Sequence, residues 1–250
     1  VPMRFAFRRR ELLVTDTGTL PETLDGLNVV RTQYLGAQRG VHCISAELSP
    51  DAQAPAGHRF SGLRQLFGRV DPTLLAIAGR AVQIVEWDRT HQFCGACGEP
   101  TLLSATENSR SCPDCKMPMY PRLSPAMIVA VERGDQLLLA RSPHFPPGIF
   151  SMLAGFVEPG ESAEEAVIRE VYEETRLVVH DVRYFGSQPW PFPNSLMLGF
   201  IAQYKSGEID VEHDELEAAG WYEVANLPRT FPGNVSISQW LLQDYVRRRS

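Results

Sequence analysis

Residues 155–177 read GFVEPGESAEEAVIREVYEETRL, and this stretch predicts a helix that carries a cluster of carboxylates. Ser162 followed by Glu165 is a capping box, so we expect the helix to begin at Ser162. Glu170 and Glu174 then fall on one helical face, at the end of a stripe of small apolar residues. The stretch therefore predicts a helix that directs several carboxylates toward one point.

These carboxylates favour a bound divalent cation. Glu170, Glu173 and Glu174 would repel one another unless a cation lay between them, and Mg²⁺ or Mn²⁺ takes oxygen ligands of this kind and shares them with substrate phosphates. Arg169 is expected to reach Glu165 and Glu173, each one helical turn away. A Glu cluster is usually a solvated acidic face, but the long gapped pattern here argues against that interpretation.

The spacing of Gly155, Glu161, Arg169-Glu170 and Glu173-Glu174 resembles the Nudix box of hydrolases that cleave nucleoside diphosphates linked to another group. One position departs from that pattern. Arg176 stands where the family usually has Gly, at the expected end of the helix, where a left-handed residue is common. Arg176 carries no ligand role in the resemblance, so we expect activity to survive.

Size and charge narrow the classes of protein. The 250 residues suit two domains, or one domain and a small module. The chain lacks an apolar run long enough for a membrane span and lacks a signal peptide, so we expect a cytoplasmic protein without a membrane partner. A net charge of −6 argues against broad electrostatic binding of nucleic acid, so an RNA substrate would be recognised at its end. The basic triplets 8–10 and 247–249 are expected to be solvated termini rather than RNA contacts.

Four of the five cysteines form a zinc-binding pattern. Cys94 and Cys97, and then Cys112 and Cys115, make two Cys-x-x-Cys knuckles, which can hold one tetrahedral zinc ion. A redox dithiol needs one knuckle, and disulfides are rare in a reducing compartment. With four thiolates no coordination position stays open, so the zinc is expected to be structural. Cys43 is expected to be a small buried apolar residue.

The chain divides into three expected parts. Residues 1–92 alternate short apolar runs with turns and include a helical pattern at 73–87, which indicates a small mixed α/β N-terminal domain. Residues 93–121 form the zinc ribbon, and 120–125 are expected to be a linker. Residues 122–250 are expected to form a Nudix hydrolase domain with an α/β/α sandwich fold. Its expected strands are 126–131, 136–140, 178–185, 196–204 and a piece at 221–222, followed by a helix at 236–249.

Residues 187–195 read SQPWPFPNS. Three prolines alternating with two aromatics predict a stiff loop that cannot join a sheet ladder and that presents Trp190 and Phe192 to a flat ring. The alternative is a proline-rich connector whose aromatic rings are tucked into the core.

A zinc ribbon, a Nudix box and SQPWPFPNS together resemble the NADH pyrophosphatases, the NudC-type Nudix hydrolases. The resemblance runs from Ala78 to the C-terminus and is faint before it. It implies hydrolysis of the diphosphate of NADH or NAD to nicotinamide mononucleotide and AMP, removal of NAD caps from RNA 5′ ends, and a homodimer. It also implies catalytic Mg²⁺ or Mn²⁺ beside one structural Zn²⁺.

The resemblance also implies roles for individual residues. The implied ligands of the divalent metals are the Ala154 carbonyl, Glu170, Glu174 and Glu215, with Glu212 or Glu217 as alternatives to Glu215. Glu174 is our first choice for the base that deprotonates water and Glu173 the second, with Glu170 as the third catalytic glutamate. Phe156 is expected to stack on the nicotinamide. The other implied substrate contacts are Arg64, Glu107, Tyr120, Gln188, Pro189, Trp190, Pro191, Phe192, Pro193, Asn194, Ser195 and Ser238, the last near a helix N-terminus suited to phosphate.

Two alternatives stay open at this point. The chain could be a Nudix hydrolase of another nucleotide, such as ADP-ribose or a dinucleoside polyphosphate, but such an enzyme has no need of the SQPWPFPNS segment. It could instead be a zinc-ribbon binding protein with an inactive Nudix domain, an interpretation that only Arg176 favours. Metal-dependent turnover of NADH would separate these classes.

Overall fold

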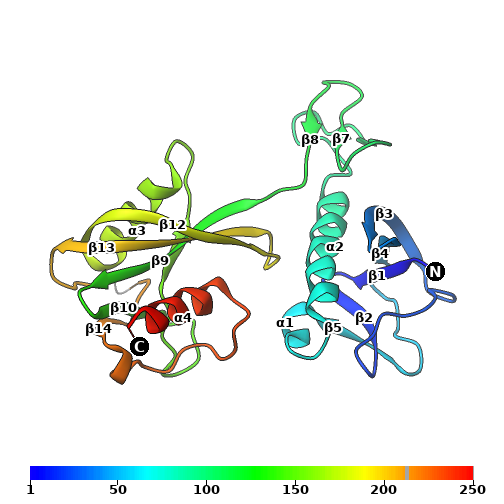
Figure 1. Ribbon diagram of the computed structural model, residues 1–250. Coiled ribbons are helices and arrows are strands. Elements are labelled where there is room, and N and C mark those ends of the chain that lie inside the picture. The colour runs from blue at the N-terminus through cyan, green and yellow to red at the C-terminus, as the bar shows by residue number, and fades with distance from the viewer. Residues whose placement is uncertain (212–213, 250) are drawn as a thin grey trace. The chain divides into compact units, whose positions relative to one another are not determined.

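Figure 1 shows the computed structural model, which describes residues 1–211 and 214–249. The chain forms two compact units. The first comprises Val1–Arg122 together with Pro191–Asn194, and the second comprises Leu123–Trp190 together with Ser195–Ser250. Within the described ranges, the helices are all too short or too polar to span a bilayer.

The first unit is built on a five-stranded sheet in the order β3-β4-β1-β2-β5. β1 and β4 pair in parallel, and the other neighbours pair antiparallel. The strands are β1 Met3–Arg8, β2 Glu11–Thr15, β3 Val29–Gln38, β4 Val41–Leu48 and β5 His58–Gly62, followed by the short helix α1 Leu63–Leu66.

Helix α2, Pro72–Thr90, covers one face of this sheet (Figure 1). It begins where the sequence favours a start, because the Asp71 carboxylate accepts hydrogen bonds from the backbone N–H groups of Thr73 and Leu74, and proline occupies the first turn. The helix predicted at 73–87 is thus confirmed. Cys43 lies buried in the same core, also as predicted.

The zinc ribbon follows α2 and contains three two-residue strands, β6 Leu102–Leu103, β7 Arg110–Ser111 and β8 Pro118–Met119. Arg110 attaches it to α2. Its buried guanidinium forms an ion pair with the buried carboxylate of Asp88, and its Nε donates to Thr101 Oγ1 at 2.7 Å.

The second unit contains a six-stranded mixed sheet in the order β12-β13-β9-β10-β14, with β11 paired to β9. β9 and β13 are parallel, and the remaining pairs are antiparallel. The strands are β9 Ser124–Arg133, β10 Gln136–Arg141, β11 Leu153–Phe156, β12 Val178–Trp190, β13 Ser195–Ser206 and β14 Ala218–Tyr222.

Alternate residues of β9 face two different cores. Met127, Val129 and Val131 pack in the cluster that includes residues of α3, Ala163–Thr175. Ile128 and Ala130 pack in the cluster that includes residues of α4, Ile237–Arg249. The two helices therefore cover opposite faces of the sheet, which confirms the predicted α/β/α sandwich.

The predicted loop at 187–195 is wrong over its first half. β12 continues through Ser187 to Trp190, and Pro189 pairs with Leu196 in the ladder. A proline is tolerated here because β12 is an edge strand of the sheet, where a missing N–H breaks no pairing on the open side. The loop proper is Pro191–Asn194. The linker predicted at 120–125 is also shorter than expected, since β9 begins at Ser124.

The basic C-terminal triplet is not simply solvated. Arg248 and Arg249 both bond the carboxylate of Glu132, a buried residue of β9, so the end of α4 is fixed to the sheet. Only Arg247 matches the expectation, with a side chain that is 80% exposed. The sequence pattern failed here because it does not show the buried partner.

The N-terminal triplet differs from the prediction in the same way. Arg8 pairs with Glu11 at 2.7 Å, and Arg10 donates to two backbone carbonyl oxygens of the 191–194 loop. Arg9 is exposed, as expected.

Candidate active site

Helix α3 carries the predicted carboxylates and begins as the sequence predicts. Ser162 is the N-cap, its Oγ accepts from Glu165 N at 3.2 Å, and the Glu165 carboxylate accepts from Ser162 N at 2.7 Å. Arg176 ends the helix with φ 60° and ψ 14°, the left-handed conformation expected at a C-cap. A residue other than glycine therefore adopts this geometry here.

Arg169 connects the helix to the loop before it. Its guanidinium pairs with Glu161 at 2.6 Å and with Glu173 at 2.9 Å, and it donates to the Phe156 carbonyl at 2.9 Å. The expected pair with Glu165 is absent among these contacts because the capping box already engages that carboxylate. The hydrogen bond from Arg169 lowers the pKa of Glu161 to about 2, so Glu161 stays ionised and holds Arg169 in place.

Glu170 lies against the backbone of Gly155 in β11. A Cβ built on Gly155 would overlap the Glu170 carboxyl group. This close approach explains in physical terms why the motif requires glycine at this position. It also brings the Glu170 carboxylate to the strand that holds the Ala154 carbonyl.

Glu174 is the most deeply buried of these carboxylates, with 7% of the residue exposed. Burial, followed by the negative charges of Glu170, Glu215 and Glu173, raises the pKa of Glu174 to about 8. Burial also raises the pKa of Glu170. Among the residues described, no cation or hydrogen-bond donor pairs with the Glu174 carboxylate, so this position lacks its own positive charge.

A cavity of about 610 Å³ gathers most of the predicted catalytic groups in the second unit. Ala154, Glu170, Glu174 and Glu215 all line it, and so does Phe156, a residue that is 57% exposed. The lining residues that the sequence did not single out include His144, Phe145, Glu158 and Asp214. They lie on connecting segments without periodicity, so only their nearness to the motif glycine or to the acidic stretch could have indicated them.

The oxygen atoms at this cavity suit a hard divalent cation. The Glu170, Glu174 and Glu215 carboxylates and the Ala154 carbonyl are the ligand types that Mg²⁺ and Mn²⁺ prefer. Such a cation would also offset the repulsion that raises the pKa of Glu174.

The alternative metal ligands and the alternative base do not line the cavity among the described residues. Glu217 pairs with Arg141 at 2.7 Å and is not among the lining residues, and Glu212 lies outside the described residues. The side chain of Glu173 is 54% exposed, pairs with Arg169 and does not line the cavity.

The zinc pattern forms a compact group of four thiols. The sulfur atoms of Cys94, Cys97, Cys112 and Cys115 all lie within 4.8 Å of one another. Thiolates bound to one tetrahedral zinc at about 2.3 Å lie about 3.8 Å apart, so the arrangement fits the ion. The Cys94–Cys115 separation of 3.5 Å and the Cys97–Cys112 separation of 3.4 Å agree with it.

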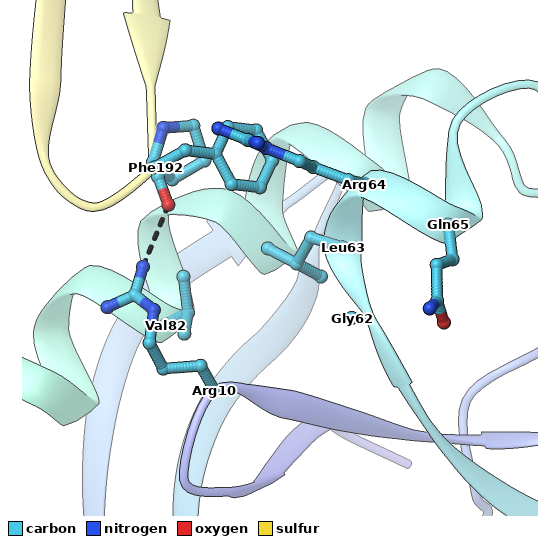
Figure 2. Close-up of a pocket in the computed structure, with 8 residues that line it drawn as sticks. Arg10, Gly62, Leu63, Arg64, Gln65, Val82 and Phe192 are labelled. Carbon is cyan, nitrogen blue, oxygen red and sulfur yellow. Dashed lines mark hydrogen bonds between the residues drawn. The ribbon is translucent and has the colours of Figure 1, made fainter. Parts of the chain in front are cut away.

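A second group of predicted substrate residues lies in the first unit. Arg64 of α1 places its guanidinium 4.6 Å from the centre of the Phe192 ring. Figure 2 shows Arg64 lying over that ring, beside a pocket of about 240 Å³ that Pro191 also lines. Asn194 donates to the Arg122 carbonyl at 3.4 Å. Pro193 belongs to the same unit.

Tyr120 and Glu107 lie in the segment of the zinc ribbon. Tyr120 is 58% exposed, and Glu107 accepts a hydrogen bond from the Ser109 hydroxyl at 2.9 Å. These two residues are thus in the first unit, whereas the carboxylates line the cavity of the second.

The remaining predicted contacts cluster near the start of α4. Gln188 donates to the Val235 carbonyl and accepts from the Ile237 N–H, both in hydrogen bonds of 2.6–2.7 Å. The Ser238 hydroxyl lies 3.1 Å from that of Ser151. Ser195 is buried, while Pro189 and Trp190 end β12. Because Gln188 already accepts from the Ile237 N–H, that donor is not available to a phosphate.

Comparison with known proteins assigns every part of this architecture. Three family models match the chain: an NADH pyrophosphatase-like rudimentary NUDIX domain at residues 3–87, an NADH pyrophosphatase zinc ribbon domain at 89–120 and a NUDIX domain at 121–241. The resemblance therefore extends well before Ala78. A crystal structure of a NUDIX hydrolase from Nitrosomonas europaea superposes with a TM-score of 0.53 at 20% identity, over 63% of this chain and 92% of that one. It shows the fold alone.

Curated relatives match nearly the whole chain. The NAD-capped RNA hydrolase NudC of Stutzerimonas stutzeri is 47% identical, over 96% of this chain and 88% of its own length. The protein of the same name from Deinococcus radiodurans is 44% identical, over 96% and 86% respectively. A structural Zn²⁺ in the ribbon and catalytic Mg²⁺ or Mn²⁺ accompany this domain set. The chain belongs to the NudC family of Nudix hydrolases that carry the NADH pyrophosphatase zinc ribbon.

Proposed function

We propose that this enzyme hydrolyses the diphosphate of NADH and NAD to nicotinamide mononucleotide, reduced or oxidised, and AMP, and that it removes NAD caps from RNA 5′ ends. The observation that carries the proposal is the 610 Å³ cavity, where Glu170, Glu174 and Glu215 meet beside an exposed aromatic ring, Phe156. The names of the relatives from Stutzerimonas stutzeri and Deinococcus radiodurans support the capped-RNA substrate.

The proposed mechanism assigns the carboxylates two tasks. Glu170, Glu174, Glu215 and the Ala154 carbonyl would hold Mg²⁺ or Mn²⁺, and the bound cation would supply charge neutralisation of the diphosphate and a more acidic water molecule. The Glu174 carboxylate accepts the proton of the attacking water, because it is the most deeply buried of the motif glutamates and lines the cavity. Glu173 is the second candidate for the base. Its exposure and its pair with Arg169 favour Glu174.

We propose the substrate contacts on the same footing. Phe156 stacks on the nicotinamide, while Tyr120, Glu107 and Arg64 bind other parts of the dinucleotide. The segment from Gln188 to Ser195 lines the nucleotide pocket, and the region of Ser238 contributes at the start of α4. The exposed rings of Phe156 and Tyr120 support these roles, since a planar ring offers a stacking surface at low entropic cost.

The proposal also covers the organisation of the protein. It assigns residues 1–92 to the N-terminal domain, 93–121 to the zinc ribbon and 122–250 to the catalytic domain. The enzyme is proposed to be a cytoplasmic homodimer. Four thiols that converge on one metal site suit a reducing compartment, which supports the location.

Product analysis tests the proposal. The zinc-loaded protein would be incubated with NADH and Mg²⁺ or Mn²⁺, beside a Glu174→Gln control, and the products separated by chromatography. Reduced nicotinamide mononucleotide and AMP from the unsubstituted protein alone are the expected result. ADP-ribose, a dinucleoside polyphosphate and NAD-capped RNA would be compared in the same assay. Turnover of ADP-ribose without turnover of NADH or capped RNA would contradict the proposal.

A further inference from the structure

We infer that Arg10 is a positioning residue for substrate binding, because it fixes the 191–194 loop within the first unit. The inference rests on the proposed function, in which this loop lines the nucleotide pocket. Arg10 is the last residue of the basic triplet 8–10 and lies in the turn between β1 and β2. Its Nη2 atom donates to the Pro191 carbonyl at 2.9 Å and to the Pro193 carbonyl at 3.1 Å.

The loop has few backbone donors of its own. Pro191 and Pro193 have no backbone N–H, so two of its four residues cannot donate a hydrogen bond to a loop carbonyl. A guanidinium presents several N–H donors in a fixed planar fork and stays charged, so one side chain can bond two carbonyls at once. Figure 2 shows Arg10 reaching the loop, with the hydrogen bond to Pro191 as a dashed line.

Arg10 is itself held in place. Its Nη1 atom lies 3.7 Å from the carboxylate of Glu86 on α2, and only 39% of its side chain is exposed. Glu86 also pairs with Arg89 at 3.0 Å, which limits the movement of the carboxylate. The guanidinium is thus fixed between a helix and the loop, at the boundary of the 240 Å³ pocket that Arg64 and Phe192 also line.

Gly79 of α2 provides the space that the loop requires. A Cβ built on Gly79 would lie 3.0 Å from Pro191 Cγ, so an alanine would force the proline ring to shift by a few tenths of an ångström. Glycine in the middle of a helix costs about 1 kcal/mol relative to alanine, so the helix itself gains nothing from it. The close approach to Pro191 gives this glycine a reason to be there.

Three variants test the inference. Arg10→Gln removes the charge and the fork, Arg10→Lys keeps the charge without the fork, and Gly79→Ala displaces Pro191 without touching Arg10. Arg9→Gln is the matched control, because Arg9 is the exposed neighbour in the same turn. The readouts are KM and kcat for NADH, amide hydrogen exchange at Phe192 and Asn194, the zinc content and the thermal midpoint.

We expect Arg10→Gln to raise KM about tenfold, equivalent to about 1.4 kcal/mol, with kcat changed less than twofold. Amide exchange at Phe192 and Asn194 should accelerate, while zinc content and the thermal midpoint stay those of the Arg9→Gln control. Arg10→Lys should recover part of the lost affinity. Gly79→Ala should raise KM while leaving the thermal midpoint unchanged or higher, a combination that a merely structural role does not produce.

The inference is overturned if Arg10→Gln leaves both KM and loop exchange unchanged. It is also overturned if every variant that raises KM also lowers the thermal midpoint to a matching extent. Failure of the proposed function is a separate result. In that case the unsubstituted protein does not cleave NADH, and the exchange at Phe192 and Asn194 still decides whether Arg10 holds the loop.

Discussion

Glu170 occupies the space that a side chain on Gly155 would need. Gly155→Ala must therefore displace the Glu170 carboxylate from its position in the cavity. We expect a loss of kcat of about 100-fold or more, because a displacement of about 1 Å at a reacting site has effects of this size. Steady-state kinetics with NADH would measure the loss, and the circular dichroism spectrum should remain that of the folded protein. An alanine variant with full activity would show that Glu170 is not a metal ligand.

The raised pKa of Glu174 predicts that the free energy of unfolding depends on pH. The prediction applies to protein that contains its zinc ion but no Mg²⁺ or Mn²⁺. The folded protein keeps a proton on this carboxyl up to about pH 8, whereas the unfolded chain releases it near the ordinary value of 4.5. The unfolded chain thus binds fewer protons in this interval, so the contribution to stability is lost as the pH rises from 4.5 to 8.

Thermal unfolding between pH 5 and 8.5 checks this prediction. Glu174→Gln should lack that part of the pH dependence, and at pH 8 it should be more stable than the unsubstituted protein without Mg²⁺. Added Mg²⁺ should stabilise the unsubstituted protein and not the variant. The same substitution should lower kcat by about 10²–10⁴-fold if Glu174 is the base. Equal pH profiles for both proteins would argue against a buried, unpaired carboxylate.

Phe156 allows a test of nicotinamide recognition. The residue is 57% exposed and lines the cavity that holds the carboxylates, so Phe156→Ala removes a stacking surface and little of the core. We expect KM for NADH to rise by about tenfold, as the loss of a stacked base costs about 1–3 kcal/mol. KM for ADP-ribose, which lacks nicotinamide, is the internal control and should change less. Equal increases for both substrates would remove the nicotinamide role.

Zinc should control the stability of the first unit without supplying the catalytic cation. Cys97→Ser removes one of the four thiols, so the variant should bind zinc weakly and its first unit should unfold at a lower temperature. Calorimetry and metal analysis would measure this together. The residual activity should still require Mg²⁺ or Mn²⁺. Activity supported by Zn²⁺ alone, without the other cations, would be the contrary result.

The ion pairs of Glu132 predict that Arg248 and Arg249 contribute strongly to folding stability. Burial alone would raise the pKa of Glu132, but the bonds from Arg248 and Arg249 outweigh it and lower that pKa. Replacing both arginines with alanine would leave a buried charge unpaired, at a cost of about 3–5 kcal/mol in unfolding free energy.

Adding Glu132→Leu to this double variant should restore much of that stability, because an apolar side chain tolerates the same burial. Arg247→Ala is the control, since its side chain is 80% exposed. Chemical denaturation of the four proteins would measure these differences. If the double variant is as stable as the control, the ion pairs contribute little.

Local signals in the sequence predicted more of this molecule than long-range ones. The start of α3 at Ser162 and the left-handed end at Arg176 depend on residues a few positions apart, and both are confirmed. One-turn spacing predicts that Arg169 pairs with Glu165 and Glu173, but only the pair with Glu173 is among the contacts of Arg169. The spacing does not reveal that the capping box already engages Glu165. The predicted loop at 187–190 failed because a proline is excluded from a central strand but not from an edge, and the sequence does not show which strand is the edge.

The candidate site also combines features that the local motif predicted with features that only the structure shows. The motif located the carboxylates, and the structure adds that Glu174 is buried while Glu173 is exposed. Arg10 bonds Pro191 and Pro193, and Arg248 bonds Glu132. Each of these partners is more than 100 residues away in the chain, so no local pattern could have indicated them.

The alternation along β9 gives its substitutions two separate phenotypes according to odd or even residue number. Met127, Val129 and Val131 support the side of the sheet that carries α3, so enlarging or shortening them should reduce turnover first. Ile128 and Ala130 support the side of α4, where the same changes should reduce resistance to heat more than they reduce turnover. A complete substitution scan of this one strand, scored separately for activity and abundance, should therefore alternate with a period of two residues.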